Sequence, residues 1–204
     1  MCSSDLRGPG VPQSQCCRRV RLRRELHGLS VNATAGATAR DYFSLFQLEP
    51  DFALDETTLE RAYHTLLTQF HPDRYAGKPQ VEQRVAAQFC ADINSGYRIL
   101  SDEVSRAEYL LQQAGVDLVA AERAGVESTF LMTQISLREQ LEELEPADAA
   151  GRQSLTAEIE GHYATSRDQF ASTLSTGAHL DAARHWQEMC YLSKLLSEPK
   201  LRVS

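Results

Sequence analysis

The chain has 204 residues, of which 42% are hydrophobic and 24% charged, a composition typical of a soluble globular protein with one or two domains. The net charge of -7 divides unevenly: residues 1–40 carry seven Arg against Asp5 and Glu25, or +5, and the remaining residues carry 14 basic and 26 acidic side chains, or -12. So acidic a body argues against nucleic acid as a partner, since that binding depends on Lys and Arg. No apolar run approaches the roughly 18 residues of a membrane span, so we expect no transmembrane helix and no membrane partner.

Residues 1–40 show no apolar periodicity and are rich in Gly, Ser, Ala and Arg. We expect a disordered extension that is dispensable for folding and binding. Three explanations stay open from the residues alone: an Arg-rich organellar presequence, a basic arm that touches nucleic acid or membrane, and translated sequence upstream of the true start.

Five cysteines, Cys2, Cys16, Cys17, Cys90 and Cys190, are too few and too irregularly spaced for a disulfide framework, which favours a reducing compartment. Cys16 and Cys17 are adjacent, whereas zinc sites separate paired thiolates, so we expect no structural metal. Cys90 and Cys190 lie in predicted helices, where a buried free Cys acts as a small hydrophobe.

The folded part is predicted to begin with a short helix capped by Asp41 and a longer helix capped by Asp55. Apolar residues in the longer helix recur with a helical period, which no strand has, at Leu59, Ala62, Tyr63, Leu66, Leu67 and Phe70. A further long helix carries its apolar residues at Val85, Phe89, Ile93, Tyr97 and Leu100. These stripes predict two helices that pack against each other.

His71-Pro72-Asp73 lies between these two long helices. Pro72 disfavours helical geometry at His71 and so ends the helix that precedes it. An exposed His-Pro-Asp turn between antiparallel helices resembles the J-domain, with which Hsp40-type co-chaperones engage Hsp70 and stimulate its ATP hydrolysis. The segments 41–46 and 93–100 look like the first and third helices of such a domain. The alternative is an ordinary turn in which Asp73 caps a helix start.

A fourth helix is predicted from Ser101 to a stop at Gly115, with apolar residues at Val104, Ala107, Leu110, Leu111 and Ala114. The first domain therefore spans 41–113, and 114–121 is predicted as a linker.

The second domain, residues 122–204, is predicted as a three-helix bundle, because short connections imply antiparallel neighbours. Its first helix is ended by Pro146, and Asp148 caps the second, which runs to Gly177. The apolar seams of the three helices are, in order, Phe130, Leu137, Leu141 and Leu144; Leu155, Ile159, Tyr163, Phe170 and Leu174; and, within 179–197, Leu180, Ala183, Trp186, Cys190 and Leu195. The fold class is all-α.

A J-domain followed directly by a small helical bundle, without a Gly-rich region or a Cys-rich zinc module, resembles the HscB family. The resemblance covers about 41–200 and is most specific at Phe130-Leu131-Met132 and Leu137-Arg138-Glu139. These co-chaperones of iron-sulfur cluster assembly bring the scaffold IscU to the Hsp70-type chaperone HscA. The resemblance implies a chaperone role in protein folding and protein complex oligomerization, activation of the Hsp70 ATPase, no enzymatic activity, no cofactor and a bacterial cytoplasmic location, with mitochondria as the alternative.

Bacterial members begin close to the Asp41-Tyr42-Phe43 stretch, so the resemblance favours a true start near Val31 for this chain. A J-domain co-chaperone that serves a different client is the alternative function. An acid-base or metal site at His71 and Asp73 is a third reading. It would need further convergent groups from the other imidazoles of the folded part, which are His64, His162, His179 and His185. No Gly-rich phosphate loop or His-X-X-X-His pair accompanies them.

By resemblance, the Hsp70-contacting residues are His71, Pro72, Asp73, Arg74 and Arg61, and the scaffold-contacting residues are Leu131, Met132, Ile135, Glu139, Glu143 and Tyr191. Two departures stand out: Ser136 occupies a position where a carboxylate is common, and the helix before the turn has only Arg61 and His64 as positive groups.

Helix geometry supports the scaffold surface independently. At about 100° per residue, Leu131, Met132 and Ile135 lie well around the helix from the core seam. The alternative is that these three residues pack under the first domain or the last helix.

Overall fold

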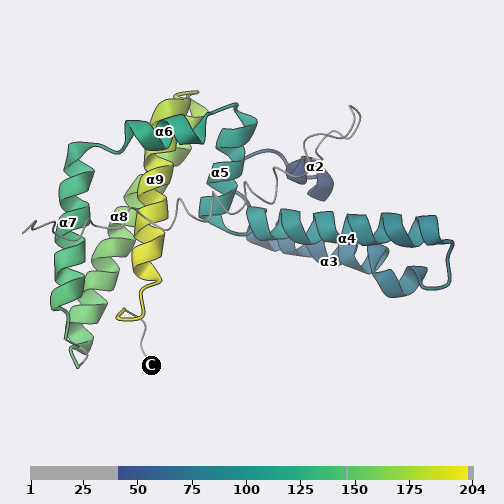
Figure 1. The fold of residues 1–204 in the computed structure, drawn as a ribbon, viewed down its shortest axis with the longest axis horizontal. Helices are drawn as coiled ribbons and strands as arrows, with labels where there is room; N and C mark the ends of the chain where they lie inside the picture. The colour runs from purple at the N-terminus through teal and green to yellow at the C-terminus, as the bar shows by residue number, and fades with distance from the viewer. Residues whose placement is uncertain (1–40, 146, 202–204) are drawn as a thin grey trace, which may run out of the picture. The chain divides into compact units, whose positions relative to one another are not determined.

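The computed structural model describes residues 41–145 and 147–201, and the expectations for residues 1–40, including their three cysteines and a start near Val31, lie outside the described residues. Within the described part, all regular structure is helical (Figure 1). The all-α prediction is therefore confirmed.

The amino-terminal helices form as the sequence predicts. Helix α2 (Tyr42–Phe46) is capped by Asp41, whose carboxylate accepts hydrogen bonds from two backbone N–H groups of the first turn. Helix α3 (Glu56–Phe70) is capped by Asp55 and followed by the 3₁₀ turn η1 (Pro72–Tyr75), and α4 (Gln80–Leu100) returns alongside α3 (Figure 1).

The seam between α3 and α4 departs from the prediction at one point. Val85 is half exposed, and Ala86, at 1% exposed, takes the buried position. The reason lies in the elements that α4 packs against: α3 ends at Phe70, and η1, which contacts α4 after it, has no buried side chain. From Phe89 onward the predicted stripe holds, because Phe89 stacks on Phe70 at a ring-centroid distance of 4.6 Å and Ile93 is fully buried.

Two helices lead into the second half of the chain. Helix α5 (Glu103–Gln113) begins two residues later than the predicted start at Ser101, and its cap is Asp102, whose carboxylate accepts the Ser105 N–H. Helix α6 (Leu118–Ala124) begins inside the stretch predicted as a linker, and its Leu118 and Ala121 are buried. The predicted domain limits at 113 and 122 stay predictions.

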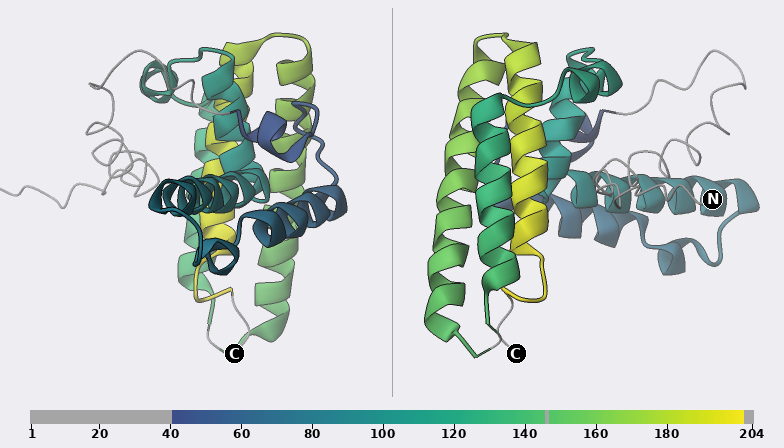
Figure 2. Two further views of the ribbon diagram at one scale, coloured as in Figure 1. Left: turned by 90° about the vertical axis from the view of Figure 1, so that its right-hand side faces the viewer. Right: turned by 60° about the vertical axis from the view of Figure 1, so that its left-hand side comes forward.

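Three long helices form the carboxy-terminal bundle: α7 (Ser128–Glu143), α8 (Ala149–Ser175) and α9 (His179–Leu196), which lie side by side (Figure 2). The second half of α7, the first half of α8 and the second half of α9 pack around an apolar core. This core comprises Leu137, Leu141, Leu155, Ile159, Leu192, Leu195 and Leu201. The predicted seam residues Phe130 and Leu144 are half-buried against this core. Cys90 and Cys190 are half-buried, less enclosed than predicted.

The second half of α8 and the first half of α9 pack against the amino-terminal helices. Phe170, predicted in the bundle seam, instead lies edge-on to Phe52 at 4.7 Å. Leu180 is exposed, which contradicts its predicted core position. The buried face of α9 here comprises Ala182, Ala183, Trp186 and Met189, and Leu180 lies roughly 140° around the helix from the centre of that face.

Polar contacts join the same two regions. Trp186 donates its indole N–H to the Val104 carbonyl at 3.2 Å, and Tyr163 donates its hydroxyl to Glu103 at 2.9 Å. Arg106, 3% exposed, donates to the carbonyls of Phe52 and Leu100, and its burial lowers the pKa of the guanidinium. Residues from both halves of the described chain therefore share one core.

Candidate partner-binding surfaces

The His-Pro-Asp turn is exposed and locally ordered. His71 caps η1: its Nδ1 accepts the Asp73 N–H at 3.3 Å, and its carbonyl accepts the Arg74 N–H at 3.0 Å. The same Nδ1 lies 3.6 Å from the Asp73 carboxylate, and the Asp73 side chain is 90% exposed. The turn therefore holds His71 and Asp73 next to each other at the surface.

Side chains anchor the turn to α3. Arg74 donates from Nη1 to the Thr68 carbonyl at 3.0 Å, where a cation also complements the negative end of the helix. Arg61, earlier on α3, donates to the Thr57 carbonyl and to the Thr58 hydroxyl and remains exposed. The structure thus places His71, Pro72, Asp73 and Arg74 together in the turn, and Arg61 lies farther back on α3.

On α7 the three predicted apolar residues are exposed. Leu131 is 47%, Met132 66% and Ile135 51% exposed, while Leu137 and Leu141 face the core. Packing under the first domain or the last helix is therefore not what the structure shows. We call Leu131, Met132 and Ile135 the α7 patch.

Tyr191 of α9 lies beside α7. Its hydroxyl donates to the Gln134 carbonyl at 3.1 Å, its ring meets Phe130 edge-on at 6.1 Å, and partial burial raises the pKa of its phenol. Glu139 and Glu143 are exposed farther along α7. The α7 patch thus has the contact of Phe130 with Tyr191 beside it and acidic side chains farther along the same helix.

Residues beyond α9 also hold α7, and sequence reasoning missed them. Lys200 donates to the Leu141 and Glu142 carbonyls, each at 3.0 Å, and Arg138 pairs with Glu142 and with Glu198. These contacts stabilise the carboxyl end of α7. Arg138 and Glu142 have the ordinary i,i+4 spacing, but no spacing rule predicts the contacts of Glu198 and Lys200, whose partners are about sixty residues away.

No group of three or more His, Cys, Asp or Glu residues among the described residues is arranged to hold a metal ion. The helices described there include none that is long and apolar enough to cross a membrane.

Comparison with protein families divides the chain in two. Residues 41–109 match the DnaJ domain, and residues 126–200 match the HSCB C-terminal oligomerisation domain.

Curated relatives and solved structures agree with this division. The chain is 36% identical over 158 residues to a co-chaperone protein HscB homolog of Burkholderia cenocepacia, a match that covers 77% of this chain and 90% of that protein. It is 39% identical over 165 residues to the homolog of Bordetella petrii, over 78% and 94% of the two chains. The HscB structure from Vibrio cholerae superposes with a TM-score of 0.69 at 30% identity, over 76% of this chain and 93% of that one. Human HscB, at 24% identity and a TM-score of 0.70 over 81% and 83% of the chains, shares the fold. This chain belongs to the HscB family of J-domain co-chaperones.

Proposed function

We propose that this co-chaperone delivers an IscU-type scaffold to an HscA-type Hsp70 during iron-sulfur cluster assembly and stimulates the ATPase of that chaperone through its His-Pro-Asp turn. The observation that carries the proposal is that one chain exposes both a His-Pro-Asp turn and an apolar patch on a separate helix. The two surfaces suit two different partners.

The turn suits a contact with a charged surface. The Asp73 carboxylate can form a charge-assisted hydrogen bond with a guanidinium or ammonium group, which is stronger than a neutral one. Pro72 and the hydrogen bond from the Asp73 N–H to His71 restrict the turn before docking, so less conformational entropy is lost on binding. Binding then biases the chaperone between its own states through differential affinity. The ATP is hydrolysed by the chaperone, and this chain needs no catalytic residue, cofactor or metal.

The α7 patch suits an apolar protein surface. Exposed apolar residues bordered by polar or charged ones are the usual anatomy of a protein-binding site. Fully burying one such side chain is worth roughly 1.5 to 3 kcal/mol, so three can supply the centre of an interface. Tyr191, Glu139 and Glu143 would contribute at its edge.

The location we propose is the bacterial cytoplasm, and the Burkholderia and Bordetella relatives support it. A J-domain co-chaperone for another client is the second candidate. Ser136, exposed on α7 where a carboxylate is common in the family, is the observation that favours it.

A reconstituted ATPase assay tests the proposal. Purified HscA-type chaperone is measured alone, with this chain, with an IscU-type scaffold and with both. We expect stimulation with this chain, greater stimulation with both partners, and none from this chain in the absence of chaperone. A scaffold that is neither bound nor able to add to the stimulation would favour the other client, and ATP hydrolysis by this chain alone would contradict the non-enzymatic role.

A further inference from the structure

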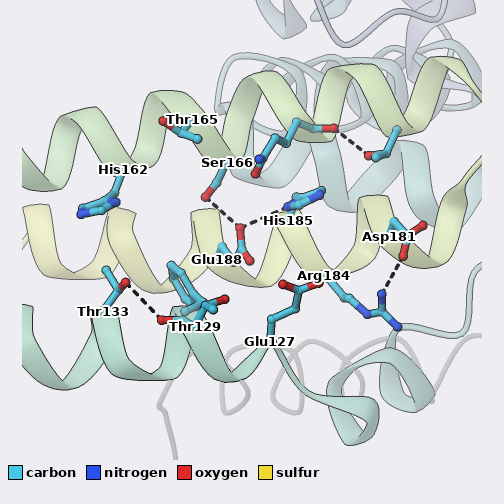
Figure 3. A pocket seen from close by; sticks show the side chains of 13 residues that line it. Glu127, Thr129, Thr133, His162, Thr165, Ser166, Asp181, Arg184, His185 and Glu188 are labelled. Atoms are coloured by element: carbon cyan, nitrogen blue, oxygen red, sulfur yellow. Dashed lines mark hydrogen bonds and ion pairs between the residues drawn. The ribbon is translucent and has the colours of Figure 1, made fainter.

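A polar groove opens where the bundle core ends. It encloses about 450 Å³ between the first half of α7, the middle of α8 and the first half of α9 (Figure 3). Below it, α8 and α9 contribute Ile159 and Leu192 to the apolar core, whereas at groove level they present Ser166 and Glu188. The volume lies within the range of about 300 to 1,000 Å³ found for ligand sites.

The groove contains a buried carboxylate. Glu188 is 8% exposed, and its Oε2 accepts from the Ser166 hydroxyl at 2.9 Å and lies 3.2 Å from Nδ1 of His185 (Figure 3). Since a carboxylate only accepts, Nδ1 of His185 carries a proton at this contact. Burying a carboxylate costs free energy that an apolar residue here would not cost.

Four of the five hydroxyls that line the groove donate their proton within the protein. Thr133 donates to the Thr129 carbonyl, Thr165 to the Gly161 carbonyl, Ser166 to Glu188, and Thr173 to the Gln169 carbonyl. A hydroxyl has one proton and two lone pairs, so these oxygens can offer only lone pairs to a ligand. The ionised carboxylates have no proton to donate and also act only as acceptors.

The charges that line the groove also favour a ligand that donates hydrogen bonds. The groove is lined by the carboxylates of Glu127, Asp181 and Glu188 against one permanent cation, Arg184, whose Nη1 is held by Asp181 at 2.7 Å. With the histidines neutral, the groove carries a net charge of -2. A ligand that donates hydrogen bonds and carries positive charge fits these groups.

The groove and the α7 patch lie on different sides of α7. Thr129, Phe130 and Thr133 line the groove, and the centre of the α7 patch lies roughly 160° around the helix from them. A protein that covers the patch therefore reaches the groove only with a segment that extends around α7.

We propose that the groove binds a Lys or Arg side chain from a basic segment of the same scaffold protein that covers the α7 patch. This inference rests on the proposed function, because it takes the scaffold as the partner on α7. The apolar patch then supplies contact area, and the groove selects partners whose adjoining segment is basic.

Charge removal gives the first test. Calorimetry measures the affinity of an IscU-type scaffold for Glu127→Gln with Glu188→Gln, where the amide oxygen introduced at position 188 keeps an acceptor for Ser166. The matched control, Glu49→Gln with Glu160→Gln, removes two exposed charges away from the groove. We expect the groove variant to bind about tenfold or more weakly and to lose part of the salt dependence of binding, and the control to match the unmodified protein.

Charge insertion gives a second test that does not touch a buried group. Thr129→Arg places a cation in the groove from an exposed position in the first turn of α7, and Ser128→Arg places the same cation one residue away, outside the lining. We expect scaffold affinity to fall by about tenfold or more for Thr129→Arg and to change little for Ser128→Arg. Melting temperatures of all four variants establish that each is folded.

The outcomes separate this inference from the proposed function. If the scaffold binds and Leu131→Ala with Met132→Ala weakens it, but both groove variants bind as tightly as their controls, the groove assignment is wrong and the proposed function stands. If the unmodified chain does not bind the scaffold, both are wrong.

Discussion

The His-Pro-Asp turn and the α7 patch present their groups by different means: a short irregular stretch of backbone in one case and the outer face of a regular helix in the other. None of the four residues of η1 is buried, and the turn is defined by backbone geometry, Pro72 and the His71 cap. The patch residues lie on a helix whose opposite face, at Leu137 and Leu141, is buried. The turn can therefore lose a functional group with little cost to the fold, whereas changes on α7 must be kept apart from its core face.

The largest effect is expected at the turn. His71→Gln removes the ring that caps η1 and leaves Pro72 in place, so we expect chaperone stimulation to fall to the unstimulated rate. The free energy of unfolding should change by under about 1 kcal/mol, because the site is exposed. The assay is chaperone ATPase turnover together with thermal unfolding.

The matched control is His64→Gln, an exposed histidine on α3 whose imidazole lies 3.8 Å from the Glu60 carboxylate. It should retain stimulation. Full stimulation by a folded His71→Gln variant would show that the turn is not the contact.

At the patch we expect the next largest effect. Leu131→Ala with Met132→Ala removes two exposed apolar side chains, each worth roughly 1.5 to 3 kcal/mol when fully buried, so scaffold affinity should fall by about a hundredfold. Val81→Ala with Val85→Ala removes a comparable exposed pair on α4 and should leave scaffold affinity unchanged. Calorimetric titration measures both, and a large drop in melting temperature for the α7 pair would place those residues in the core instead.

Much of this arrangement was predictable from the sequence because it is local. A helical apolar period, an Asp before some of the helices and a Pro after His71 act within a few residues. The structure confirms the helices on either side of the turn and the caps at Asp41, Asp55 and Asp148. The exposure of the α7 patch also followed from helix geometry, since the seam through Leu137 and Leu141 settles which side faces the core.

Features that depend on distant segments were not predictable in this way. Val85 and Ala86 both fit the helical period, and only the end of α3 decides which of them is buried. Leu180 fits the period of α9 but lies away from the face that meets the amino-terminal helices. Glu188 fits no apolar period, and its buried carboxylate depends on Ser166, 22 residues earlier on another helix, as well as on His185 three residues earlier.

A substitution at Arg106 tests the region that joins the two surfaces. Arg106→Met keeps the length of the side chain but removes the side-chain donor to the Leu100 carbonyl and one of two donors to the Phe52 carbonyl, which also accepts the Leu54 N–H. An unsatisfied buried acceptor costs about 1 to 3 kcal/mol. We expect denaturant unfolding to show a loss of about 3 kcal/mol, with scaffold and chaperone binding retained under conditions where the variant is folded. Arg98→Met, exposed on α4, is the control and should be close to neutral. A near-neutral Arg106→Met would mean that the joint does not depend on this side chain.

The smallest effect concerns alkaline pH and the same joint. Burial raises the pKa of Tyr109 to about 12 and raises that of Tyr163 further, with the Glu103 carboxylate adding to the shift at Tyr163. Because the unfolded chain ionises these phenols near the ordinary pKa of about 10, the stability they contribute is complete below pH 10 and is lost as the pH rises above it. Both groups are only partly buried, so the expected loss is modest, about 1 kcal/mol between pH 10 and 11. Tyr163→Phe should make the unfolding free energy fall less steeply over this interval, and Tyr75→Phe, beside the turn, should not. An equal slope for Tyr163→Phe and the unmodified protein would show that the contact with Glu103 does not couple the joint to pH.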